Sequence, residues 1–164
     1  MVDRPEVPLD ELYREVVMEH SRRPRGRAPL AHVDARAHGF NPVCGDDVYL
    51  NLALANDHIE GVQLAGRGCA ICTASGSMMA ELLAGQPITE AQSVAESFRG
   101  MMHGESLPEE HDLGDLEALQ GVQKFAVRVK CAMLPWVTLQ DALRAWRNGA
   151  ASAESSTENE DVRP

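Results

Sequence analysis

Hydrophobic and polar residues alternate along two neighbouring stretches of the chain, and this alternation predicts a pair of strands. In residues 48–55 the bulky hydrophobic side chains occupy every second position, at Val48, Leu50, Leu52 and Leu54. A period of two is typical of a strand with one buried face. Turn-forming residues follow at 56–61, and residues 62–68 supply a second strand. Because so short a turn joins the two strands, we expect them to pair as an antiparallel hairpin.

Elsewhere, hydrophobic residues recur at intervals of three and four, which predicts helices. The expected helices cover residues 9–22, 69–84, 89–102 and 131–147, with a short helical turn at 116–120. Pro135 falls in the first turn of the last predicted helix, where a missing N–H costs little. A further short strand is expected at residues 31–38. Helices that flank a small antiparallel meander place the fold in the α+β class.

The length and composition indicate one domain followed by a tail. The chain has 164 residues, of which 44% are hydrophobic and 24% charged, as in ordinary globular proteins. Residues 148–164 are small, polar and acidic, and they offer almost nothing to bury. We therefore expect a folded domain over residues 1–147 and a disordered acidic tail over residues 148–164.

The charge and the hydrophobic segments restrict the possible partners. A formal net charge of −10 argues against a nucleic-acid partner, whose phosphates would be repelled. No secretory leader is recognisable, and no stretch approaches the ~18 apolar residues that span a bilayer, so we expect a cytoplasmic protein without membrane contact. The basic cluster "SRRPRGR", residues 21–27, is either the solvated end of a helix or a docking patch for an acidic partner.

Local topology gathers a carboxylate and two thiols at one end of the predicted hairpin. Cys44 and Asp46 precede the first strand, and Cys69 follows the second. In an antiparallel hairpin the start of one strand lies beside the end of the other, so these side chains share one end of the sheet. Cys69 and Cys131 each begin a predicted helix, where unpaired N–H groups favour a thiolate. The 61 residues between them leave open whether Cys131 joins the group.

Cys69 and Cys72 form a C-x-x-C spacing, which on its own fits either a redox dithiol or half of a four-cysteine zinc site. A thioredoxin-like redox pair would follow a strand of a parallel sheet, and no parallel sheet is expected here. We therefore interpret Cys72 as a small buried residue one turn along the helix. The six histidines show no ligand spacing and are interpreted as surface or packing residues.

Five segments of the chain carry more specific information: "LYREVVMEHSRRPRG", "NPVCGDDVYL", "GRGCAICTASGSMM", "DLGDLEALQGV" and "FAVRVKCAMLPWVTLQDAL". Together, in this order and over roughly residues 9–146, they resemble the SufU branch of the IscU/NifU N-terminal superfamily of iron–sulfur biogenesis proteins. The resemblance implies an α+β fold with a small three-stranded antiparallel sheet flanked by helices. It also implies metal ligands that converge at one end of the sheet, namely Cys44, Asp46, Cys69 and Cys131.

Two features select the SufU branch. Lys130 stands where the IscU scaffolds carry a histidine, and residues 106–122 match an insertion that SufU-like proteins carry. Cys72 departs from the family pattern, in which a small or polar residue is expected. It leaves open whether a fourth thiol replaces Asp46 as a ligand.

Three thiolates and one carboxylate suit Zn²⁺, and the same set could hold a [2Fe–2S] cluster. The SufU resemblance favours zinc and implies a sulfurtransferase that takes persulfide sulfur from a SufS-like cysteine desulfurase. Cys44, on a Gly-containing loop, is then the sulfur acceptor, and Asp46 tunes the metal and holds the loop. Arg128 is interpreted either as a partner of Asp46 or of the desulfurase, or as a solvated surface charge.

The sulfur would then pass to a downstream iron–sulfur scaffold or to apoproteins. Two alternatives use the same four side chains. In the first, the protein is itself a scaffold that assembles a [2Fe–2S] cluster and hands it on. In the second, the ligands form a closed structural zinc site with no role in transfer.

Overall fold

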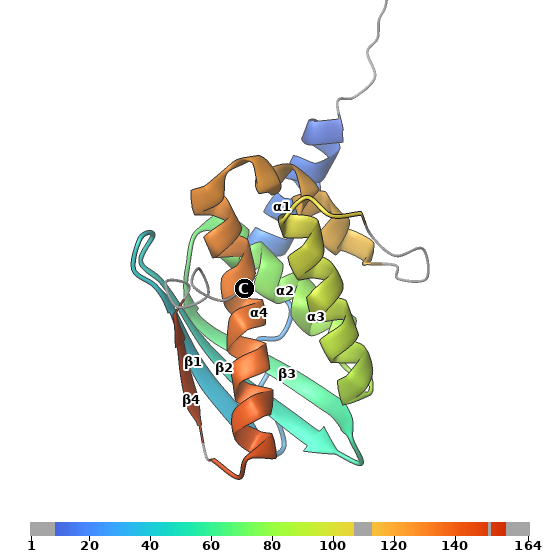
Figure 1. The fold of residues 1–164 in the computed structure, drawn as a ribbon, viewed down its shortest axis with the longest axis vertical. Coiled ribbons are helices and arrows are strands. Elements are labelled where there is room, and N and C mark those ends of the chain that lie inside the picture. The colour runs from blue at the N-terminus through green and yellow to red at the C-terminus, as the bar shows by residue number, and fades with distance from the viewer. Residues whose placement is uncertain (1–8, 107–112, 151, 157–164) are drawn as a thin grey trace, which may run out of the picture.

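The computed structural model describes residues 9–106, 113–150 and 152–156, and it consists of a β-sheet with helices packed on one of its faces (Figure 1). The helical elements are, in chain order, α1 (Leu9–Arg22), α2 (Ala70–Leu83), α3 (Ile88–Met102), the 3-10 helix η1 (Gly114–Lys124) and α4 (Ala126–Arg147). The strands are β1 (Ala35–Asn41), β2 (Asp46–Ala55), β3 (His58–Arg67) and β4 (Ala153–Ser156). This arrangement confirms the predicted α+β class. Over the described ranges, every helix is too short or too polar to cross a bilayer.

The first three strands form the predicted three-stranded antiparallel meander, in which β2 lies between β1 and β3. The turn between β2 and β3 is tighter than predicted, because only Asn56 and Asp57 separate the paired residues Ala55 and His58. Both turn residues have positive φ, 53° and 63°, as the two-residue turns that match the twist of paired strands require. At the other end of the hairpin Asp47 pairs with Arg67, so the segments that carry the thiols meet there.

β1 and β4 form the other side of the sheet. β1 covers residues 35–41 instead of the predicted 31–38, and its side chains alternate between buried and more exposed positions. β4 pairs with β1 in parallel, from Ala37 beside Ala153 to Phe40 beside Ser156. The expectation of a disordered tail over residues 148–164 is therefore corrected for residues 153–156. Composition could not predict this strand, because the strand has no hydrophobic pattern and is defined by backbone pairing. Residues 157–164 lie outside the described residues.

The helices α2 and α4 pack closely over the sheet through one aromatic side chain and several small ones. Trp136 is 1% exposed, and its ring lies 5.2 Å from that of Phe98. Its Nε1 donates a hydrogen bond to Ser75 Oγ at 3.1 Å, and this hydroxyl donates in turn to the Ala132 carbonyl at 2.6 Å. A Cβ at Gly76 would come within 3.2 Å of a Leu64 methyl, so the glycine lets α2 approach β3. This packing fixes the two helices that carry Cys69 and Cys131 relative to each other.

The last helix begins earlier than predicted, at Ala126 instead of Cys131. The prediction was wrong because the first turn is exposed and shows no hydrophobic period, whereas residues 131–139 are buried. Cys131 therefore lies in the second turn of α4 and not at its N-terminus. Pro135 lies inside the helix and not in its first turn, so the carbonyl of Cys131 lacks the amide donor that an ordinary residue would provide four positions on.

The buried side chain of His20 links three helical elements. It is 1% exposed, its Nδ1 lies 2.7 Å from Ser77 Oγ of α2, and its Nε2 lies 2.9 Å from Asp115 Oδ2 of η1. His20, Glu81 and Asp115 lie close enough to share a cation. However, the guanidinium of Arg25, from the basic cluster, already lies 3.5 Å from Glu81. We therefore interpret this group as a packing contact, in keeping with the prediction for histidines.

Candidate metal centre

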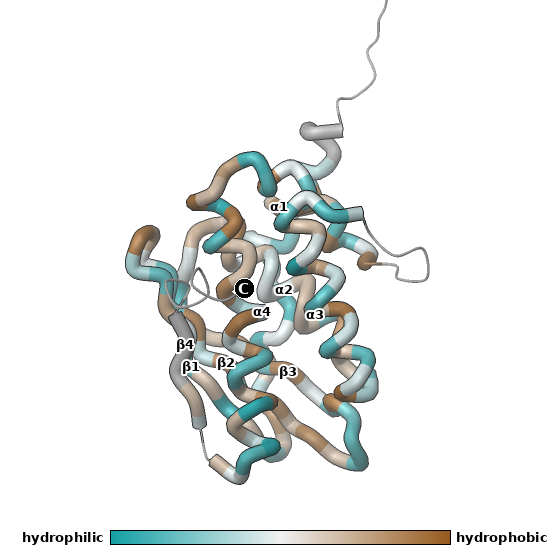
Figure 2. The backbone as a smooth tube through the Cα atoms, viewed as in Figure 1, coloured by the Kyte–Doolittle hydropathy of each residue, from teal (hydrophilic) through white to brown (hydrophobic). Residues whose placement is uncertain are grey.

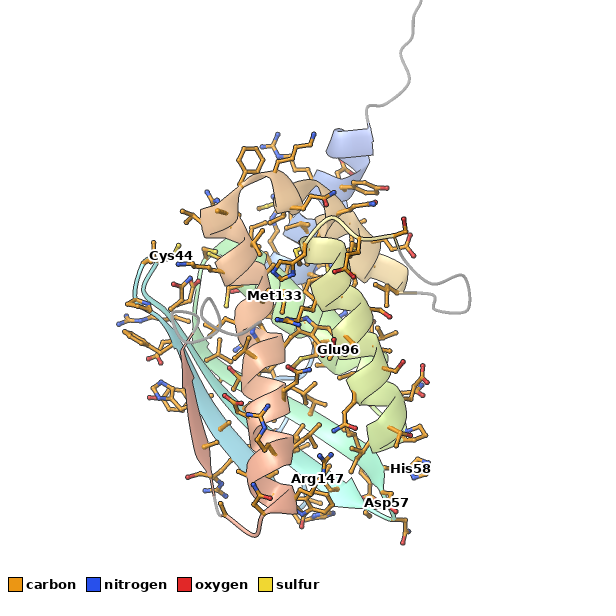
Figure 3. All side chains as sticks on the ribbon, in the orientation of Figure 1. Cys44, Asp57, His58, Glu96, Met133 and Arg147 are labelled. Carbon is orange, nitrogen blue, oxygen red and sulfur yellow. The ribbon has the colours of Figure 1, made fainter. Side chains whose placement is uncertain are left out.

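The loop between β1 and β2 presents Cys44 at the end of the sheet opposite the β2–β3 turn (Figure 3). Asn41 and Asp46 form the last pair of the β1–β2 ladder. The N–H of Gly45 donates to the Asn41 carbonyl at 2.8 Å, which closes the loop. Gly45 has a φ of +74°, a conformation that glycine adopts without a Cβ clash. The closed loop leaves the Cys44 thiol exposed.

Asp46 is a fully buried carboxyl group, with 0% exposure, at the base of this loop. Its Oδ1 accepts a hydrogen bond from the backbone N–H of Cys69 at 2.8 Å, and its Oδ2 accepts one from Asn41 Nδ2 at 3.2 Å. A buried carboxylate requires such donors, because an unpaired one would be costly to desolvate. Asp46 thus joins the start of β2 to the start of α2, as the hairpin topology predicted.

The sulfur atoms of α2, α4 and the loop meet around this carboxyl group. The Sγ atoms of Cys44 and Cys131 are 3.3 Å apart. The ligand atoms of Cys44, Asp46 and Cys131 all lie within 4.8 Å of one another. The backbone N–H of Cys69 joins this group by donating to Asp46 Oδ1 at 2.8 Å. The structure therefore brings together Cys44, Asp46 and Cys131, whose position the spacing left open, while Cys69 is not part of this close group among the described residues.

Hydrogen bonding divides these thiols by acidity. A hydrogen bond from Cys131 lowers the pKa of Cys69 to about 6 against the opposing effect of burial. The N–H groups of Cys72 and Ile71 point toward the Cys69 sulfur and lower its pKa further, although no full cap hydrogen bond forms. The pKa of Cys131 is raised first by its interaction with the Cys69 thiol, then by burial, and then by its interaction with Cys44, to whose sulfur its S–H donates at 3.3 Å. Cys69 is therefore the more acidic thiol of the pair.

The donor set fits a metal ion that prefers sulfur ligands. With Zn–S bonds of ~2.3 Å, two thiolates on one tetrahedral ion lie about 3.8 Å apart. The Cys44 and Cys131 sulfurs are 3.3 Å apart, slightly closer than this spacing. The ligand atoms of Cys44, Asp46 and Cys131 lie within 4.8 Å of one another, so the group has room for such an ion. Thiolates suit zinc and iron–sulfur clusters, and one carboxylate completes a fourth position in either. The arrangement can therefore hold Zn²⁺ or a cluster with one oxygen ligand.

Cys72 lies behind the site, on the first turn of α2, and is 2% exposed. A Cβ at Gly68 would be 3.0 Å from Cys72 Sγ and 3.2 Å from Asp46 Oδ1, so the glycine lies between this sulfur and the carboxylate. Burial, followed by the negative charge of Asp46, raises the pKa of Cys72. Among the described residues Cys72 is not part of the close ligand group, which contains Asp46 instead.

Arg128 lies beside the site, on the exposed first turn of α4. It lines a groove of about 460 Å³ together with Tyr13, Ile71 and Phe125. In the described part of the chain its guanidinium makes no ion pair with Asp46, so the structure does not place it in the ligand group. Its position on the rim of a groove leaves the other interpretation, contact with a partner, open.

Asn41 is a site residue that sequence reasoning missed. Its side chain is 0% exposed, and its Nδ2 lies 3.2 Å from Asp46 Oδ2 and 3.7 Å from Cys131 Sγ. Its Oδ1 accepts the N–H of Val43 at 3.2 Å, which ties the same side chain to the loop. The Asn-Pro dipeptide signals a turn. Nothing in the spacing, however, shows that the amide turns inward toward two candidate ligands.

Residues 12–132 match the family described as NifU-like N-terminal domain. The chain is 41% identical over 144 residues to the zinc-dependent sulfurtransferase SufU of Bacillus subtilis (strain 168), covering 86% of this chain and 95% of that protein. It is 40% identical over 140 residues to the iron–sulfur cluster assembly scaffold protein IscU of Streptococcus pyogenes serotype M1, covering 85% and 87%. A solved structure described as an iron–sulfur cluster assembly scaffold for the SUF system, from Fervidobacterium islandicum AW-1, superposes with a TM-score of 0.73 at 32% identity, covering 79% and 94%.

Proposed function

Because the chain belongs to the family of NifU-like N-terminal domains, we propose that it is a zinc-binding sulfur-transfer protein of iron–sulfur cluster biogenesis. Its sulfur donor is a SufS-like cysteine desulfurase, and the sulfur passes on to an iron–sulfur scaffold or to apoproteins. The observation that carries the proposal is one exposed thiol, Cys44, held against the buried Asp46 and Cys131. The 41% identical relative named as a zinc-dependent sulfurtransferase supports the choice of metal and of activity.

The metal is held by four side chains, which are Cys44, Asp46, Cys69 and Cys131. When bound, zinc keeps the ligating thiols deprotonated and shields them from oxidation. Asp46 is the one oxygen donor among sulfurs, and its hydrogen bonds to the Cys69 N–H and to Asn41 fix its orientation. Such supporting hydrogen bonds orient a ligand and tune the metal.

Cys44 is the sulfur acceptor. Its thiolate attacks the outer sulfur of the desulfurase persulfide, and a new S–S bond forms on Cys44. The old S–S bond breaks, and the desulfurase cysteine leaves with the electron pair as a thiolate, so the exchange needs no added oxidant or reductant. Cys44 suits this role because its thiol is exposed on the β1–β2 loop, whereas Cys131 is fully buried on α4.

Exposed hydrophobic side chains beside the site provide a surface for the desulfurase. Val43 on the loop is 54% exposed, and Phe125 and Val127 at the start of α4 are 59% and 49% exposed. Figure 2 shows hydrophobic colouring at the tip of the β1–β2 loop and at the start of α4. Apolar residues that stay exposed together mark interaction sites. The groove next to them, with Arg128 on its rim, adds a positive charge to this surface.

The test follows the sulfur. The protein is incubated with a SufS-like desulfurase and sulfur-labelled cysteine, and label is located on the tryptic peptide of residues 37–67, which contains Cys44. Cys44→Ala should lose the label, while Asn51→Ala, which alters a hydrogen bond to Gln63 elsewhere on the sheet, should keep it. Uptake of label by Cys44→Ala at the wild-type rate would refute the role of this thiol.

The second candidate function is a scaffold that assembles a [2Fe–2S] cluster on the same ligands. The observation that favours it is the 40% identity to a relative named as an IscU scaffold protein. Metal content separates the two functions: we expect purified protein to contain about one zinc per chain, and Asp46→Ala to contain much less. Anaerobic reconstitution that yields iron and acid-labile sulfide in near-stoichiometric amounts would instead support the scaffold.

A further inference from the structure

The first turn of α2 carries two thiols at its beginning, and the proposed function uses only one of them. Cys69 is the N-cap of α2, and Cys72 is the third residue of the helix. The Thr73 N–H donates to the Cys69 carbonyl at 2.9 Å, so the helical turn closes at Cys69. Residues three apart in a helix have Cα atoms roughly 5 Å apart. A disulfide spans Cα separations of ~4.4–6.8 Å, so this spacing suits a Cys69–Cys72 bond.

The two thiols differ in access in the way that a redox pair requires. Cys69 is half-buried and can meet a small molecule, whereas Cys72 is 2% exposed and cannot. Because only Cys69 is accessible, it is the thiol that reacts first. From the sequence, Cys72 is expected to be only a buried residue of the helix, because no parallel sheet is predicted. The distance between the thiols, however, is set by the helical turn after β3 and not by the type of sheet.

We propose that Cys72 is the resolving thiol of a reversible Cys69–Cys72 disulfide formed by exchange with a small-molecule disulfide. In the first step Cys69 attacks the oxidant, forms a mixed disulfide with one half of it and releases the other half as a thiolate. In the second step Cys72 gives its proton to the thiolate released in the first step and attacks the Cys69 sulfur; the bond to the small molecule breaks, and its second half leaves with the electron pair as a thiolate that takes a proton from water. The cysteine pair is thereby oxidised by two electrons, and the oxidant is reduced to two thiols.

The consequence for the metal rests on the proposed function. Cys69 is one of the four proposed ligands, so its disulfide would leave three and release the metal. The pair therefore couples a disulfide oxidant to loss of the metal and would be reset by a reducing thiol. A competing bond is geometrically available, because the Sγ atoms of Cys44 and Cys131 are 3.3 Å apart. The experiment has to separate the two pairs.

Tryptic digestion distinguishes a Cys69–Cys72 bond, which lies within one peptide, from a bond between peptides. Cys44 falls in the peptide of residues 37–67, Cys131 in that of residues 131–144, and Cys69 and Cys72 share the peptide of residues 68–99. The full chain, as purified and after a chelator, is incubated with oxidised glutathione, quenched by alkylation, digested and weighed by mass spectrometry. Zinc release is followed in the same samples with a chromogenic chelator. Cys72→Ser and Cys72→Ala are compared with wild type, and Thr73→Ser serves as the neighbouring control.

In the wild type and Thr73→Ser we expect the 68–99 peptide to become lighter by two hydrogen atoms, with only transient glutathione on it. In both Cys72 variants we expect glutathione to persist on Cys69 at least ten times longer. Persistent glutathione in the wild type, two free thiols in the 68–99 peptide after either treatment, or a bond joining any two of the peptides 37–67, 68–99 and 131–144 in its place would overturn the proposal. Sulfur transfer is read on a different peptide, 37–67, so failure of the redox pair leaves the proposed function standing, and the reverse also holds.

Discussion

Removing the Asn41 side chain should weaken both the fold and the metal centre, by amounts that the structure allows us to work out. Asn41→Ala deletes the donor to the buried Asp46 carboxyl at 3.2 Å and the acceptor for the Val43 N–H, also at 3.2 Å. A hydrogen bond to a charged group contributes ~1.5–3 kcal/mol and a neutral one about 1 kcal/mol. We therefore expect the free energy of unfolding of the metal-free protein to fall by about 3 kcal/mol.

The same substitution should lower metal affinity, because Asn41 orients one proposed ligand and lies 3.7 Å from the sulfur of another, Cys131. Loss of such a supporting contact typically costs 10–100-fold in metal affinity. Urea unfolding at two wavelengths gives the stability, and competition with a chelator of known zinc affinity gives the binding constant. The matched control is Asn51→Ala, which removes a hydrogen bond from β2 to Gln63 on the neighbouring strand β3.

Two results would contradict this reasoning. Zinc affinity of Asn41→Ala within a factor of two of the wild type would mean that Asp46 keeps its orientation without the amide. A loss of stability no larger than that of Asn51→Ala would mean that the carboxyl group finds another donor, such as water, once the side chain is removed. Either result would mean that Asn41 does not support the metal centre.

Three further predictions follow from individual contacts. Gly68→Ala places a Cβ 3.0 Å from the Cys72 sulfur and 3.2 Å from Asp46 Oδ1, so we expect zinc binding about tenfold weaker, measured by chelator competition. The control is Gly121→Ala, whose Cβ would have no heavy atom within 4 Å and which should bind zinc like the wild type. His20→Ala removes a buried ring with two hydrogen bonds and should lower the free energy of unfolding by about 3 kcal/mol in urea, whereas His58→Ala, at an exposed site, should cost far less. Since the pKa of Cys69 is lowered to about 6, iodoacetamide should label Cys69 but not Cys72 in metal-free protein at pH 7. Labelling of Cys69 should decline as the pH falls through about 6. Equal labelling of Cys69 and Cys72 would contradict the assignment of Cys69 as the more acidic thiol.

The sequence predicted those parts of the site that depend on neighbouring segments. The period-two pattern defined the β2–β3 hairpin, and an antiparallel hairpin necessarily returns Cys69 to Asp46, whose hydrogen bond at 2.8 Å now joins them. Family resemblance alone supplied Cys131, because its approach depends on how α4 packs across the sheet. Periodicity misplaced the start of α4, since residues 126–128 are exposed and residues 129 and 130 are only partly buried.

Two other features could not be predicted for physical reasons. The inward turn of Asn41 depends on tertiary contacts with Asp46 and Cys131 and leaves no trace in residue spacing. β4 is held by backbone pairing with β1, and amino-acid composition does not predict backbone pairing. Side-chain patterns report what a segment buries, and neither feature is determined by a buried hydrophobic face.

Pro135 gives α4 an uneven stiffness along its length. Because the proline supplies no N–H, the carbonyl of Cys131 is released from the ladder of hydrogen bonds that resists bending elsewhere in the helix. The residues before this point, 126–130, are mostly exposed, whereas those after it are anchored in the core through Trp136. A force applied to the exposed end of α4 would therefore meet its weakest resistance at the turn that carries Cys131, and the buried half of the helix would act as the fixed support of a hinge.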